Sequence, residues 1–131
     1  AHHPQLHDTV RRQRQMCIRD SLYLVDKFEK AAQKLTSEFD FNVNSLITGG
    51  DYKNELNLLA LVSYNSKGNQ YLILFERFDL ENLEENTFKK YIIPLERAQI
   101  ESIKIIDKKT FWITSEDEGI GNPFMYKLKV K

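Results

Sequence analysis

Histidine and cysteine are almost missing from this sequence. Its 131 residues include three histidines and one cysteine, and all of them lie before residue 22. The rest of the chain therefore cannot assemble a Ser-His-Asp or Cys-His nucleophilic site, or a zinc site of the Cys/His kind. Without cysteine there, disulfides give no indication of the redox compartment. No apolar run reaches the roughly 18 residues of a spanning helix, so no transmembrane segment is predicted.

Aromatic residues show the opposite bias, because every Phe, Tyr and Trp lies after residue 21. Residues 1–21 carry a cluster of arginines without hydrophobic periodicity, which is typical of a tail. One interpretation is a basic arm that binds nucleic acid. However, RRQRQMCIRDS (11–21) resembles one reading frame of a transposase-type sequencing-library adapter at every position. We therefore expect residues 1–21 to be a non-native, disordered tail, with no nucleic-acid partner.

Residues 22–131 alternate short apolar segments, rich in β-branched and aromatic residues, with polar turns. This pattern predicts an all-β fold. The strands are expected at 22–27, 45–49, 57–63, 71–77, 89–93, 101–106, 110–115 and 124–130. LLALV and YLILF are continuously apolar, so both of their faces should be covered. For residues 26–39, apolar spacing leaves open whether the segment is helix or strand and loop.

Internal repeats relate several of these segments at a spacing of about fifty residues. The matched pairs are LYLVDKF (22–28) with LILFERF (72–78), GNQYLILF (68–75) with GNPFMYKL (121–128), and SLITGGDY (45–52) with SIKIIDK (102–108). Phe28 and Phe78 should then occupy equivalent sites in adjacent sheets. A four-stranded unit recurring at this spacing is typical of propeller blades. The order predicts two strands of one blade, four of the next and three of a last. The missing N-terminal blades of the same chain would be its partners.

At SLITGGDY, AQIES and WITSEDEG the sequence resembles uncharacterised bacterial β-propeller-like proteins of the secreted or cell-envelope kind. The resemblance implies a β-propeller fragment over residues 22–131, with about two four-stranded antiparallel blades plus a partial one. It also implies an extracellular or cell-envelope location. It says little about function, because propellers support binding, scaffolding and hydrolysis alike. The chain departs from the family pattern at Ser102, where glycine is usual, and at Lys104.

Carboxylates are the main catalytic groups that remain. The candidates lie at predicted strand ends, where a pair of them could bind Ca²⁺ or act as acid and base: Asp51, Glu101, Glu116, Asp117 and Glu118. Gln99 and Glu101 open a strand that approaches the central channel in the resembled proteins, so both are candidate ligand contacts. The structural alternative is that Asp51 and the equivalent Asp107 accept backbone N–H bonds in Asx-turns. TSEDEG (114–119) fits no complete Ca²⁺ loop.

Two further features have mainly structural interpretations. Trp112 lies between Phe111 and Ile113 in a predicted strand, which favours core packing over sugar stacking. Gly49 and Gly50 are followed by no lysine in the P-loop pattern, so we expect a backbone bend or a close strand approach.

Three hypotheses follow. The first is a non-catalytic binding or scaffold module for an unknown protein or carbohydrate ligand, with no catalytic residue, cofactor or metal. The alternative is a propeller hydrolase that uses carboxylates and Ca²⁺, so enzymatic activity stays open. The third is a free-standing all-β sandwich, with its sheets packed face to face around one closed core. A hydrolase requires converging carboxylates, whereas a binding module permits them to scatter.

Overall fold

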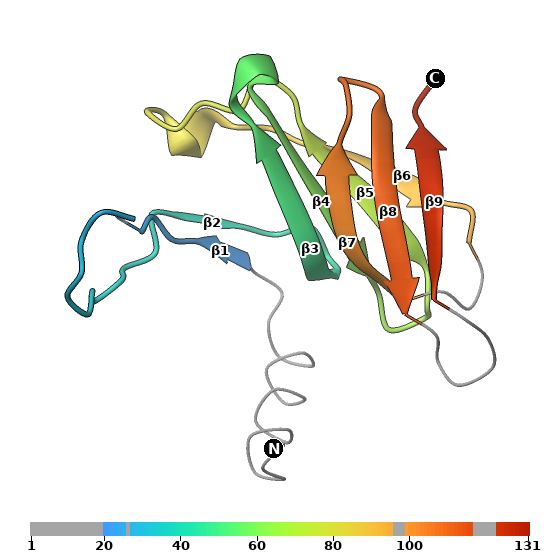
Figure 1. Cartoon of the computed structure of the whole chain (residues 1–131), viewed down its shortest axis with the longest axis horizontal. Coiled ribbons are helices and arrows are strands. Elements are labelled where there is room, and N and C mark those ends of the chain that lie inside the picture. The colour runs from blue at the N-terminus through green and yellow to red at the C-terminus, as the bar shows by residue number, and fades with distance from the viewer. Residues whose placement is uncertain (1–19, 26, 96–98, 117–122) are drawn as a thin grey trace, which may run out of the picture. The chain divides into compact units, whose positions relative to one another are not determined.

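The structure is a computed structural model that describes residues 20–25, 27–95, 99–116 and 123–131 (Figure 1). This part of the chain is all-β, as predicted, and contains no α-helix. The chain divides into two compact units, Ala1–Leu46 and Ile47–Lys131, which are described separately below. The strands in the described part are β1 (Asp20–Leu22), β2 (Phe39–Phe41), β3 (Leu46–Lys53), β4 (Leu58–Tyr64), β5 (Gln70–Phe75), β6 (Lys89–Ile93), β7 (Gln99–Ile105), β8 (Thr110–Glu116) and β9 (Phe124–Lys129).

The first unit contains one short antiparallel pair, β1 with β2, in which Asp20 lies opposite Phe41. Ser21 Oγ donates a hydrogen bond to Asp40, the residue opposite it in β2. Asp20 and Ser21 thus lie in a strand, although the sequence analysis assigned them to the tail. Residues 1–19, which include the rest of that tail, lie outside the described residues.

Two predictions for this unit are wrong. Residues 23–25 do not continue β1, as the strand expected at 22–27 requires. For residues 27–38, where the sequence left helix or strand and loop open, the structure has turns and irregular backbone. Phe28 is 80 % exposed, whereas Phe78 is 4 % exposed, so the two do not occupy equivalent sites. A short apolar run forms a strand only where a partner strand hydrogen-bonds it, and the local sequence LYLVDKF does not specify that partner.

The second unit contains two sheets, with strand orders β3-β4-β5-β6 and β7-β8-β9. With the β1–β2 pair, the described strands fall into groups of two, four and three, the succession expected from the repeats, although β2 lies in none of the eight expected strand ranges. Polar turns join neighbouring strands. Between β4 and β5, Asn65 Oδ1 accepts the backbone N–H groups of Lys67 and Asn69, and Gly68 adopts a φ of 83°. Asn and Gly supply this turn because both tolerate the local backbone geometry.

The two sheets pack face to face over one hydrophobic core. The four-stranded sheet contributes Leu58, Ala60, Val62, Leu72, Leu74 and Ile93, and the three-stranded sheet contributes Ile100, Ile103, Ile105, Phe111 and Ile113. Leu59, Leu61, Ile73 and Phe75, which alternate with these residues in β4 and β5, are also buried. The prediction that LLALV and YLILF have both faces covered is therefore confirmed.

The other two sequence repeats match equivalent strands in separate sheets. GNQYLILF contains β5 and GNPFMYKL contains most of β9, and each is the third strand of its sheet. SLITGGDY contains most of β3 and SIKIIDK most of β7, and each is the first strand of its sheet. Residues 121 and 122 of the second match lie outside the described residues.

Candidate functional site

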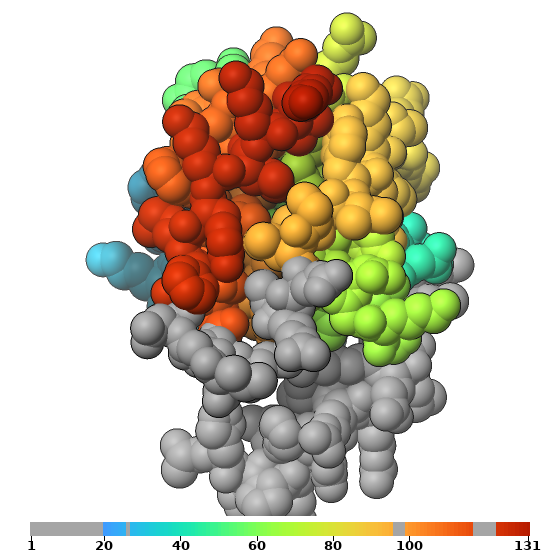
Figure 2. All heavy atoms as spheres, turned by 90° about the vertical axis from the view of Figure 1, so that its right-hand side faces the viewer, coloured from blue at the N-terminus to red at the C-terminus, as the bar shows by residue number. Residues whose placement is uncertain are grey.

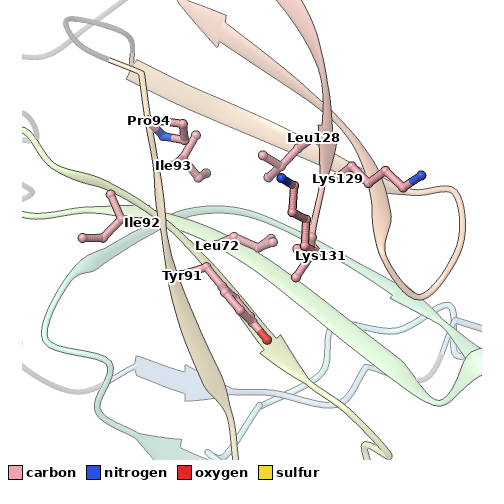
Figure 3. A pocket seen from close by; sticks show the side chains of 9 residues that line it. Leu72, Tyr91, Ile92, Ile93, Pro94, Leu128, Lys129 and Lys131 are labelled. Carbon is pink, nitrogen blue, oxygen red and sulfur yellow. The ribbon is translucent and has the colours of Figure 1, made fainter.

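A groove of about 370 Å³ opens between the outer margins of the two sheets in the second unit. Its lining comes from β5, β6 and β9, with the two residues that follow β9: Leu72, Tyr91, Ile92, Ile93, Pro94, Leu128, Lys129, Val130 and Lys131. Figure 3 shows Ile93 and Leu128 on facing sides of this space. The groove lies away from the hydrogen bonds between the sheets, which join β3 and β5 to β7.

β6 forms one wall through the alternation of its side chains. Tyr91 pairs with Leu72 of β5 and Ile93 pairs with Gln70, so these residues share the face that is turned toward the core. Ile92 points to the other face and is 72 % exposed. Pro94 follows directly and has no N–H to extend the ladder. The wall is therefore mainly apolar.

β9 forms the opposite wall with its own alternation. Tyr126, Leu128 and Val130 pack against the core, whereas Met125, Lys127 and Lys129 are exposed. Lys127 Nζ lies 5.9 Å from the centroid of the Trp112 ring on that exposed face. Figure 2 shows the red atoms of β9 and of the residues after it beside the amber atoms of β6. The groove thus combines an apolar floor with lysine side chains along one rim.

The predicted ligand contacts lie elsewhere, and the structure brings only some of them together. Gln99 and Glu116 are opposite one another where β7 begins and β8 ends. Glu101 follows at an irregularity in the β7–β8 register, between Ile100 and Ser102, and its Oε1 atom is shielded from solvent. Asp51 lies by the other end of β7, where its Oδ2 accepts the backbone N–H of Ile105 at 2.8 Å. Six residue-to-residue steps, about 20 Å, separate the two ends of β7.

The structure assigns different structural roles to the two aspartates. Asp107 accepts the N–H of Lys109 at 2.9 Å, as predicted for an Asx-turn. Asp51 is not at a turn: it lies within β3 and bonds to β7 of the neighbouring sheet. Lys104 Nζ also lies 3.4 Å from Asp51 Oδ2, so the two side chains form an ion pair. The local sequence could not show a partner more than fifty positions away.

Gly49 confirms the predicted close approach of two strands. A Cβ atom built on Gly49 would lie 2.7 Å from the backbone oxygen of Glu101. The prediction for Trp112 is wrong, because this side chain is 40 % exposed and lies on the outer face of its sheet. The neighbouring Phe111 and Ile113 take the core positions instead. Because side chains alternate along a strand, either Phe111 and Ile113 or Trp112 can face the core. The sequence FWI does not show which of the two faces it.

The described residues hold no group of three or more His, Cys, Asp or Glu side chains placed to bind a metal ion. Asp117 and Glu118 of TSEDEG lie outside the described residues. No helix within the described ranges has the length and apolar character needed to cross a membrane.

The sequence indicated part of the groove but not the groove itself. The alternation in FMYKLKV predicts an outer strand with a lysine-bearing face, which β9 is. The opposing wall from β6 could not be predicted, because nothing in KKYII shows which sheet it faces. Comparison with known protein families, curated proteins and solved structures finds no match for this chain.

Proposed function

We propose that the two larger sheets are consecutive blades of a β-propeller, and that the chain is a non-catalytic binding or scaffold module. Following the sequence resemblance, we assign it to a secreted or cell-envelope protein, with further blades of the same protein as its neighbours. The observation that carries the proposal is that the two sheets turn opposite faces to their shared core.

The repeat GNQYLILF/GNPFMYKL shows which faces these are. It aligns Leu72 and Leu74 of β5 with Met125 and Lys127 of β9. Leu72 and Leu74 belong to the shared core, but Met125 and Lys127 are exposed. On β9 the core side is formed by Tyr126 and Leu128 instead. Each sheet therefore uses a different one of its two equivalent faces at this interface.

The second strands of the two sheets follow the same rule. The pairing registers of β4 with β5 and of β8 with β9 align Ala60 with Trp112 and Leu61 with Ile113. Ala60 faces the core in its sheet, while Ile113 does so in the other. Such front-to-back contact between repeats can continue through further copies, as between propeller blades.

The sandwich hypothesis shares one feature with the structure, since the sheets pack face to face over one core. Adjacent blades also pack in this way, so this feature alone does not separate the two folds. Two details favour blades. Both sheets keep their strands in chain order, and no described strand crosses from one sheet to the other. The sheets are also hydrogen-bonded to each other from β3 to β7, whereas the groove lies between β6 and β9.

The hydrolase hypothesis requires carboxylates that converge. Asp51 and Glu116 lie near opposite ends of β7, and Asp51 is already bonded to a backbone N–H. This scatter supports the binding module. The groove supplies what a binding module needs, because small-molecule and peptide sites are concave, mainly apolar and edged by a few polar groups.

Calcium titration followed by ¹H–¹⁵N NMR tests the choice between these functions. We expect no saturable shifts at the amides of Asp51, Glu101 and Glu116, with Glu116→Gln behaving as the wild type does. Saturable shifts at these amides that disappear in Glu116→Gln would overturn the non-catalytic assignment in favour of a Ca²⁺ site.

A further inference from the structure

We draw no further inference here: the strongest candidate, the exposed Trp112 that lies between Lys104 and Lys127 on the outer face of the β7–β9 sheet, carries none, because nothing in the structure shows what covers that face.

Discussion

Thr48 and Asp51 of β3 bond directly to the backbone of β7. Thr48 Oγ1 donates to Ile100 O, and Asp51 Oδ2 accepts the Ile105 N–H at 2.8 Å. Gln70 Oε1 of β5 adds a bond to the Ile100 N–H at 3.3 Å. Since no strand in the described part of the chain pairs with β7 on this side, these side chains supply hydrogen-bond partners for its backbone groups. Single residues of one sheet thus hold the first strand of the next.

Replacing Asp51 should weaken this junction. We expect Asp51→Ala to lower the free energy of unfolding by about 1–3 kcal/mol, because the Ile105 N–H loses its acceptor. Asp51→Asn keeps an acceptor oxygen and should cost less. Lys104→Ala removes only an exposed ion-pair partner and should change stability little. Urea unfolding compares the three variants, and an Asp51→Ala protein as stable as the wild type would refute this role.

Gly49 and Gly50 form a matched pair for testing the close approach of the sheets. A Cβ at Gly49 would meet backbone atoms of Glu101 and Ser102, whereas one at Gly50 would meet the end of the Leu61 side chain. We expect Gly49→Ala to cost about 1–3 kcal/mol and Gly50→Ala clearly less, since a side chain yields more easily than backbone. Equal urea midpoints for the two variants would contradict the approach at Gly49.

Two aspartates in turns give the stability a dependence on pH. The Lys109 backbone N–H, followed by the Thr110 hydroxyl, holds the pKa of Asp107 below its usual value. The Asn82 side chain, followed by the Glu81 N–H, lowers the pKa of Asp79. Their stabilisation is present above the unfolded pKa of about 3.9 and is lost as pH falls through the folded values.

We therefore expect Asp79→Asn/Asp107→Asn to lose less stability than the wild type between about pH 5 and pH 2. Urea midpoints measured across this interval provide the comparison. A variant whose midpoint falls as steeply as that of the wild type would show that these turns are not responsible.

The sequence predicted the structural role of a residue where that role depends on its near neighbours in the chain. The Asp107 turn was predicted because its donor is two positions away, and the close approach at Gly49 because glycine permits it. The partner of Asp51 was missed because it lies in another sheet. Gln99 and Glu101 were selected from a family resemblance and Glu116 from its place at a predicted strand end, and neither criterion carried information on the groove at β6 and β9.

At the scale of elements, burial separates the strands into two classes. β4 and β5 are almost fully buried, whereas β1 and β2 have three residues each and no buried residue. Strands of the first class were predicted to within three residues, because their apolar runs are long and bounded by turns. β1 was displaced and β2 was missed, because short polar segments such as FDF form strands only through their partners.

Hydrogen exchange should show the same division. We expect the amides of β4 and β5 to exchange close to the rate set by global unfolding, and those of β1 and β2 to exchange much faster. A two-stranded pair of this length has little stability of its own, and exchange follows local opening. Mass spectrometry of peptic fragments resolves these segments. Comparable protection of both classes would contradict this ranking of the elements.

At the scale of the molecule, the central claim is that the β3–β6 and β7–β9 sheets are successive copies stacked front to back. The chain order of the strands and the repeat spacing were readable from the sequence, because they are properties of the chain. The opposite faces at the interface were not, because they depend on which side of each sheet finds a neighbour. That choice also leaves Trp112 and Met125 on an exposed face, where a further sheet could stack.

A solution NMR structure of the full chain tests this claim most directly. Superposition of β3, β4 and β5 onto β7, β8 and β9 should place Ile73 on Tyr126 and Leu61 on Ile113. In this superposition, the face of the first sheet that contacts the second should match the face of the second sheet that is exposed. A two-fold relation that turns equivalent faces toward each other, with Leu72 on Tyr126, would contradict the claim and establish a sandwich.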